Sequence, residues 1–254
     1  MVEGHHAHVR ANRVDRYECH GPSLIEATAR RHFVTRVDND WGVSSSSPRA
    51  FDPYGGAPRP DSLSAHLVVA SPRLEDPNFA RRVVLVLDHS DHGVLGVVLN
   101  KPGGVGVDEV LPQWHPWATP PAELFTGGPV ARNAVIGLAR LRVGEDSDAD
   151  PVTSASDGWK PIIAHAHPVG TIDLGAGPDP IADRIIGVRL FSGYAGWDAG
   201  QLEEEIEEGS WYVVKAEPND PVSADPEGLW QRVLRRQGGS LAVVSGYPVD
   251  PGAN

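Results

Sequence analysis

The sequence predicts a mixed α/β fold, because short apolar runs typical of buried strands alternate irregularly with a few helical segments. The chain has 254 residues, of which 40% are hydrophobic and 22% are charged, and this composition can build one sizeable core. Two strong strand patterns, at residues 83–87 and 94–99, are separated by an Asp/His/Gly segment typical of a hairpin loop. A hairpin within such an irregular order favours a mixed sheet.

The first half of the predicted domain supplies most of the strands. Continuous runs rich in Val and Leu predict buried strands, and Asp76 followed by Pro77 is typical of a helix start. In chain order we expect strands at residues 66–70, 83–87 and 94–99, a helix that begins at Asp76, a short helix at 107–111, a strand at 133–141 and an acidic loop at 144–159.

The second half contains the clearest helices. Asp198 is expected to cap a helix that ends before Gly209, with Leu202 and Ile206 one turn apart on its inner face. In chain order we expect strands at residues 162–165 and 185–191, a helix at 198–208, a strand at 211–216, a helix at 226–237 and a final strand at 241–244.

Residues 1–60 differ in character from the rest of the chain. They include a serine run at 44–47 and a turn-rich stretch at 51–60, and only residues 23–34 have a helical pattern, with Ser23 as its cap. Because this segment has too little apolar surface to offset its ordering entropy, we expect a mostly disordered arm before a domain at residues 61–250. Alternatively, the start of translation has been placed too far upstream, at the single methionine.

The charge balance argues against a nucleic-acid partner. The chain has 22 basic and 34 acidic residues, and residues 61–254 alone hold 14 basic and 27 acidic ones, so this segment repels a phosphate backbone. No apolar run approaches the ~20 residues of a membrane helix, and the N-terminus shows no hydrophobic signal core. A single cysteine, Cys19, excludes an internal disulfide and a CxxC pair. We therefore expect a cytoplasmic protein with no membrane partner.

The sequence has none of the common motifs that identify a type of enzymatic reaction. The chain contains no GxxxxGK[ST] phosphate loop, no GxGxxG, no GxSxG and no HExxH. We therefore predict no cofactor, no metal and no catalytic residue, and we favour a protein that is not an enzyme.

Two histidines form a weak candidate for a metal site. His165 and His167 would lie on the same face of a strand, and either Asp91 with His92 or Asp88 with His89 could add ligands. The alternative is that these histidines are ordinary polar surface groups, and we favour it because no third ligand is fixed by spacing.

Two further groups of residues could bind a ligand. Gly127 and Gly128 could expose N–H groups as an anion nest, or they could form a tight turn. Tyr194, Trp197 and Trp211, close to a predicted helix start, could form the wall of a ligand site, or they could belong to the core. We favour the structural alternative for both groups.

Four ordered blocks of residues between 62 and 250 resemble one known family. The blocks are LVVASP at 67–72 with Leu74, DPNF at 76–79 and Arg82; DH at 88–89, Gly93 and GVVLNKP at 96–102; FTGGPV at 125–130; and SGYAGWDAGQLE at 192–203 with Glu205 and Trp211. Together they are similar to the signatures of the AlgH/YqgE family, the last block to its GYAGWxxGQLExE…W pattern. One departure is Ala139, where relatives often show histidine, so no role for that histidine is carried over.

The resemblance implies mainly a fold. Members of this family are single α/β domains in which a branched, mixed sheet with a small barrel-like part surrounds helices. They are often labelled transcriptional regulators without a defined molecular activity. Because the present domain is acidic and has no recognisable recognition helix, direct DNA binding lacks physical support and any regulation would be indirect.

The signature residues allow a structural and a functional interpretation. Gly193 and Gly196 could permit tight turns between a strand and the next helix, while Trp197 closes the turn against the core. Alternatively, exposed N–H groups of the GYAGW turn could line a small anionic-ligand site. The candidate ligand-binding residues are Asp88, His89, Asn100, Gly127, Gly128, Tyr194, Gly196, Trp197 and Gln201.

Two functions therefore remain open. The favoured one is a non-enzymatic regulatory or adaptor domain that binds a protein or a small anionic ligand. The other is a cryptic enzyme, or a nucleotide- or anion-binding protein, that uses Asp88, His89 and the GYAGW turn. Under the second function His89→Ala abolishes activity or binding with little effect on melting, whereas a purely structural histidine affects stability alone.

Overall fold

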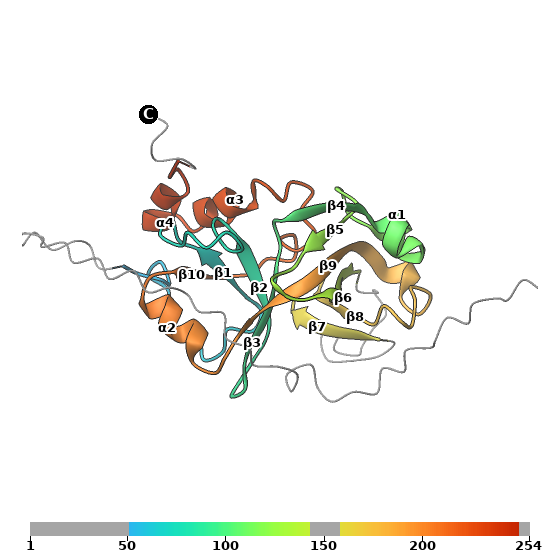
Figure 1. Ribbon diagram of the computed structural model, residues 1–254, viewed down its shortest axis with the longest axis horizontal. Coiled ribbons are helices and arrows are strands. Elements are labelled where there is room, and N and C mark those ends of the chain that lie inside the picture. Colours follow the sequence, from blue (N-terminus) through green and yellow to red (C-terminus); the bar gives the residue numbers. More distant parts are fainter. Residues whose placement is uncertain (1–50, 143–157, 249–254) are drawn as a thin grey trace, which may run out of the picture. The chain divides into compact units, whose positions relative to one another are not determined.

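Strand β9 joins the parts of a branched sheet in the residues that the computed structural model describes, 51–142 and 158–248 (Figure 1). Within these residues the ten strands follow the path β10-β1-β2-β3-β9-β6-β8-β7, and β4 and β5 branch from β9. The strands are β1 (His66–Ala70), β2 (Val83–Ser90), β3 (Gly93–Val98), β4 (Pro102–Gly106), β5 (Glu123–Thr126), β6 (Val130–Leu141), β7 (Trp159–Ile163), β8 (Val169–Ile172), β9 (Ile185–Trp197) and β10 (Trp211–Lys215).

The length and burial of β9 explain the branching. Its residues from Ile185 to Ser192 pair with β6 on one side, and Leu190 to Ser192 also pair with β5 on the other. Farther along, Ala195 to Trp197 pair with β3. The β5–β9 pair is parallel and the remaining strand pairs are antiparallel, so the sheet is mixed, as the irregular element order predicted.

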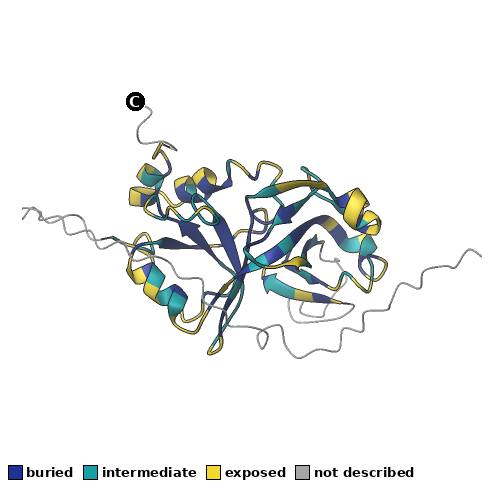
Figure 2. Ribbon diagram, in the orientation of Figure 1, coloured by how far each residue is buried: buried dark blue, intermediate teal, exposed yellow. Residues whose placement is uncertain are grey.

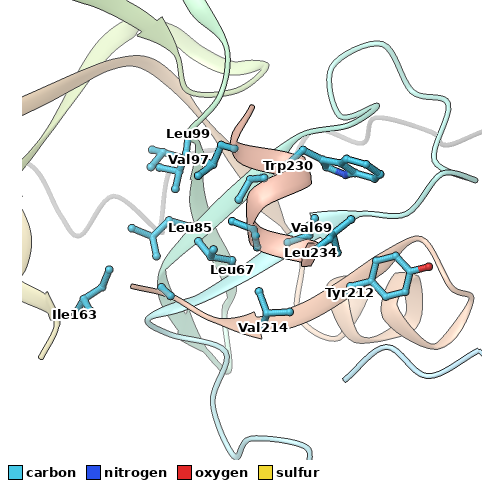
Figure 3. Packing of buried hydrophobic residues seen from close by; sticks show 14 of the residues in the cluster. Leu67, Val69, Leu85, Val97, Leu99, Ile163, Tyr212, Val214, Trp230 and Leu234 are labelled. Carbon is cyan, nitrogen blue, oxygen red and sulfur yellow. The ribbon is translucent and has the colours of Figure 1, made fainter. Parts of the chain in front are cut away.

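Most of the helices in the described residues follow the long strand β9. The helices are α1 (Val107–Val110), α2 (Gln201–Glu207), α3 (Leu229–Arg236) and α4 (Gly239–Val244), with 3₁₀ turns at Pro112–Trp117 and Ala182–Arg184. The apolar side of α3 packs on β1 and β2, where Trp230 and Leu234 meet Leu67 and Leu85 (Figure 3). Central strands are buried while the outer faces of the helices are exposed (Figure 2), as expected for amphipathic helices.

A buried arginine links β9 to two loops. Arg189 is only 2% exposed, and its guanidinium donates hydrogen bonds to the carbonyl oxygens of Pro120, Pro121 and Ser223. The guanidinium also lies 4.1 Å from the centre of the Phe125 ring. Burial lowers the pKa of Arg189 to about 10, so the side chain stays charged at neutral pH and ties the loops to the sheet.

Most of the predicted strands are confirmed with small shifts of their ends. The strands expected at 66–70, 83–87, 94–99, 133–141, 185–191 and 211–216 correspond to β1, β2, β3, β6, β9 and β10. The helices expected at 107–111, 198–208 and 226–237 correspond to α1, α2 and α3. The fold class is confirmed as a mixed α/β domain whose curled sheet forms a half-barrel.

Several local predictions are wrong, each for a physical reason. Residues 241–244 belong to helix α4, because Gly238 and Gly239 adopt positive φ angles and redirect the chain into a helix. The expected GYAGW turn is the end of β9, where β3 pairs with it. Helix α2 begins after Gly200, at φ 79°, rather than at Asp198. The segment after Asp76 forms turns and no helix. Glycine-rich or short strands β4, β5 and β8 were not predicted.

The remaining predictions fall at the margins of the described chain. The helix expected at 23–34 and most of the acidic loop at 144–159 lie outside the described residues, and Trp159 begins β7. The end of the predicted arm is described: Phe51 packs on Tyr212 with ring centres 5.1 Å apart, and Pro53 accepts a hydrogen bond from the N–H of Val213. In the described part of the chain, no helix is both long and apolar enough to cross a membrane.

Candidate functional site

His89 engages both of its ring nitrogens in structural hydrogen bonds. The N–H of Leu63 donates to Nδ1 over 3.0 Å, so Nδ1 carries the lone pair and the proton lies on Nε2. Nε2 in turn donates to Glu203 Oε1 over 3.1 Å. With neither nitrogen free, the imidazole ties the chain before β1 to helix α2 and has no site left for general-base chemistry.

Asp88 and His89 lie in the same rows of the sheet as the end of β9. Asp88 pairs with Leu95, which pairs with Gly196, and His89 pairs with Val94, which pairs with Trp197. The structure therefore brings together four of the predicted site residues through backbone register. None of these four residues lines the pocket beside Arg81 and Arg82 or the one beside Arg232 and Arg236.

Glu205 is the centre of a hydrogen-bond network built from the family signature. Its Oε2 accepts the indole N–H groups of Trp197 and Trp211 over 3.1 and 2.8 Å. Its Oε1 accepts from Gln201 Nε2 over 2.9 Å, while Gln201 Oε1 accepts the N–H of Asp198 over 3.0 Å. Every donor points toward the carboxylate, and the network fixes α2 against the ends of β9 and β10.

The aromatic residues at this end of β9 form a packed cluster. Trp197 is 6% exposed, and its ring centre lies 6.0 Å from that of Phe79 and 5.8 Å from that of Trp211. Tyr194 is partly buried and packs against the main core. These contacts are the ones that the structural interpretation of the signature requires.

Gly127 and Gly128 allow two backbones to approach closely. A Cβ atom at Gly127 would collide with the carbonyl oxygen of Gly193, and one at Gly128 would collide with the carbonyl group of Tyr194. The N–H of Gly127 donates to Ser192 O over 2.8 Å, and its carbonyl oxygen accepts from Val98. This N–H is thus used within the sheet and does not point to an open anion nest.

Asn100 extends the β2–β3 pairing with its side chain. Its Oδ1 accepts the N–H of Val83 over 3.0 Å, and its Nδ2 donates to the carbonyl oxygen of Arg81 over 2.9 Å. Its own carbonyl oxygen accepts from Arg82 Nη1 over 3.0 Å. Asn100 is 3% exposed and therefore fixes the turn that presents the two arginines.

A cationic pocket lies beside this turn. It has a volume of about 450 Å³ and is lined by Arg81, Arg82, Asn100, Lys101, Pro102, Glu227, Trp230 and Gln231. One side comes from the loops that precede β2 and β4, and the other comes from the beginning of α3. Of the nine predicted site residues, only Asn100 lines it.

The cations of this pocket are crowded and form no ion pair with a described carboxylate. Burial lowers the pKa of Arg82, and its Nε is buried without a hydrogen-bond partner in the described structure. Burial, followed by the charges of Arg82 and Arg132, lowers the pKa of Lys101, and the charge of Asp76 opposes this shift in part. Between residues 51–142 and 158–248, no ion pair involves Arg81, Arg82 or Lys101, so an added anion is electrostatically favoured.

Arg81 is held at the pocket by the C-terminal end of the described chain. Its guanidinium donates to the carbonyl oxygens of Tyr247 and Pro248 and lies 4.5 Å from the centre of the Trp230 ring. Arg81 also adopts a positive φ of 56°, a strained conformation for a side-chain-bearing residue. Strain at a ligand-facing residue is common at functional sites.

Sequence reasoning missed the three cations as site residues, although Arg82 and Lys101 lie within the blocks of the family resemblance. The one signal in the sequence is that the chain has only three lysines, of which Lys101 lies in a block of the family resemblance. The pocket itself depends on α3 approaching the β1–β2 loop, which no local pattern reveals.

The described residues contain no group of three or more His, Cys, Asp or Glu side chains arranged to hold a metal ion. His165 and His167 lie in the bend between β7 and β8, rather than on one strand face. The N–H of His167 donates to Nδ1 of His165 over 3.4 Å, which is a local contact of a loop.

The fold and the signature together define a class of α/β domains. Its members have a curled, branched sheet whose long strand β9 carries the GYAGW signature. Residues 67–242 match the model of the AlgH-like family. The chain belongs to this family.

Relatives from three organisms match most of the domain. A UPF0301 protein of Streptomyces coelicolor is 46% identical over 193 residues, which are 76% of this chain and 96% of the relative. A UPF0301 protein of Thermobifida fusca is 48% identical over 199 residues, with the same shares of the two chains. A UPF0301 protein of Mycobacterium avium is 43% identical over 188 residues, covering 74% and 89%.

Two solved structures share the fold. A crystal structure of a Corynebacterium diphtheriae protein has a TM-score of 0.68 at 32% identity and covers 79% of this chain and all of its own. The solution structure of AlgH from Pseudomonas aeruginosa has a TM-score of 0.50 at 26% identity and covers 76% and 98%. The names of these proteins state no molecular activity.

Proposed function

We propose that this domain is a non-enzymatic ligand-binding module that takes a small anion into the pocket of Arg81, Arg82 and Lys101. The observation that carries the proposal is three converging cations, without a carboxylate ion pair among the described residues, in a chain of net charge −12. Positive charge concentrated in a concave site on an acidic protein attracts anions selectively.

The shape and anchoring of the pocket support the same function. Its volume of about 450 Å³ lies in the range of small-molecule sites. Arg82 is fixed by its bond to Asn100, and Arg81 by its bonds to the C-terminal carbonyls. Fixed donors lose little freedom when a ligand arrives, which favours binding.

The proposal treats the domain as a regulatory or adaptor module of the cytoplasm, in which the bound anion modulates a protein partner. An effect on transcription would then be indirect. The alternative, catalysis at Asp88, His89 and the GYAGW segment, is less well supported because His89 has both ring nitrogens engaged.

The test measures binding of inorganic phosphate and pyrophosphate to the full chain by calorimetry and by thermal unfolding. A ligand at about a hundred times its dissociation constant adds ~2.7 kcal/mol of stability. Lys101→Gln removes a pocket charge without breaking a hydrogen bond to a described residue, and we expect at least a tenfold loss of affinity. Lys160→Gln removes the same charge from an exposed site on β7 and is the matched control.

Two outcomes contradict the proposal. One is the absence of binding by either anion at millimolar concentration and low ionic strength. The other is equal weakening by Lys101→Gln and Lys160→Gln, because this result would show that only the overall charge matters.

A further inference from the structure

The pocket has two chemically different walls. Arg81, Arg82 and Lys101 form the cationic wall from the loops of the sheet, and Glu227 and Gln231 form a polar wall from the beginning of α3. Both polar residues are exposed at the rim. A bound molecule therefore meets cations at one end and hydrogen-bonding groups at the other.

The charges of the walls match a dianion. Three cations and one carboxylate leave a formal charge of two positive units. A phosphate monoester carries about −1.5 to −2 at neutral pH and offers three acceptor oxygens. The cationic wall therefore suits one phosphate group, and Glu227 would repel a second phosphate placed near the rim.

The volume of the pocket exceeds that of a phosphate group. A phosphate takes roughly the space of three water molecules, on the order of 100 Å³ at ~30 Å³ per water, against about 450 Å³ for the pocket. Most of the space is thus left for an organic group attached to the phosphate.

That organic group finds no aromatic face on which to stack. Trp230 is 2% exposed, its indole N–H donates to Ala70 O over 2.8 Å, and Arg81 lies over its ring. Stacking of a base requires an accessible ring. In contrast, Glu227 can accept and Gln231 can both donate and accept hydrogen bonds, which suits hydroxyl groups.

We infer that the ligand is a phosphate monoester of a small polyhydroxylated molecule, such as a sugar phosphate. The phosphate binds Arg82 and Lys101, and the hydroxyl groups bind Glu227 and Gln231. This inference rests on the proposed function, because it names the class of anion for the same pocket.

The test compares four probes on the full chain by calorimetry: inorganic phosphate, glucose 6-phosphate, ribose 5-phosphate and AMP. We expect at least one sugar phosphate to bind about tenfold more tightly than inorganic phosphate, and AMP to show no advantage over ribose 5-phosphate. Glu227→Gln should weaken the sugar phosphate about five- to tenfold while leaving inorganic phosphate unchanged or slightly tighter. Glu204→Gln, an exposed carboxylate on α2, is the control for the change in net charge.

The outcomes separate this inference from the proposed function. If all phosphates bind equally and Glu227→Gln affects them equally, the polar wall has no role and the inference fails while anion binding stands. If AMP binds more tightly than the sugar phosphates, recognition of a base overturns the inference. If inorganic phosphate and the organic phosphates all fail to bind, the proposed function fails as well.

Discussion

Replacing Glu205 by glutamine should weaken the hydrogen bonds that hold helix α2 against the ends of β9 and β10. The carboxylate accepts three hydrogen bonds, from Trp197, Trp211 and Gln201. A glutamine in its place can turn its oxygen toward the two indoles, but its NH₂ group then faces the NH₂ group of Gln201. Gln201 cannot reverse, because its oxygen accepts the N–H of Asp198.

The size of the effect follows from these bonds. Hydrogen bonds to a charged group contribute about 1.5–3 kcal/mol each, and neutral ones about 0.5–1.5 kcal/mol. Glu205→Gln weakens two bonds and loses the third, and the partial exposure of Glu205 reduces the effect through solvent. We expect a loss of about 2–3 kcal/mol in the free energy of unfolding, or a drop of about 4–12 °C in melting temperature.

Urea and thermal unfolding of the full chain provide the measurement. Glu204→Gln is the matched control, because Glu204 is an exposed residue immediately before Glu205 on α2 and its replacement removes the same charge. A Glu205→Gln protein within about 0.5 kcal/mol of the Glu204→Gln protein, which is the scatter expected for surface changes, would refute the reasoning.

The remaining predictions concern the sheet and the pocket. Gly128→Ala should lower the free energy of unfolding by more than about 3 kcal/mol or prevent folding, because the added Cβ overlaps the backbone of Tyr194. A normal yield and melting temperature would contradict this. Asn100→Ala should lower the free energy of unfolding by about 2–4 kcal/mol, as measured by urea unfolding, because it leaves the buried N–H of Val83 and the partly buried carbonyl oxygen of Arg81 without hydrogen-bond partners. It should also weaken phosphate binding. His89→Ala should lower stability by about 1–2 kcal/mol and leave phosphate affinity unchanged, which calorimetry and thermal unfolding check together. Finally, because burial lowers the pKa of Lys101, the affinity for sulfate, whose own charge is constant, should begin to fall at a lower pH than the ~10.4 at which an ordinary lysine loses its proton. This loss should be smaller in Lys101→Gln.

The sequence was most informative where local patterns and burial agree. The Val- and Leu-rich runs of β1, β2 and β3 are mostly buried, although Leu87 and Leu95 are only partly so, and their composition sufficed to predict strands. The prediction of a final strand at 241–244 was wrong because four consecutive apolar residues fit a strand or a helix equally well. The positive φ angles of the two preceding glycines favour the helix. Strand β4, Pro102–Gly106, could not be expected from PGGVG, since tertiary pairing with β5 alone makes it extended.

The candidate residues were harder to interpret than the fold. Glu205 carries the signature network, but from the sequence it was one acid among five on a solvated helix. Its role depends on two tryptophans that approach from β9 and β10. The cations of the pocket depend likewise on the contact between α3 and the β1–β2 loop, a distance of about 150 residues along the chain that no local rule spans.

The shared strand has a consequence for how the domain comes apart. β9 pairs with β3 at one end and with β5 and β6 at the other. If β9 separates from the strands at either end, the strands at the other end are left with an exposed edge. Unfolding should therefore be a single cooperative transition, and the amides of β9 should exchange with solvent only through global opening. A fragment that ends before Ile185 would lack the strand on which both sides depend, so the domain has no smaller folding unit within its described length.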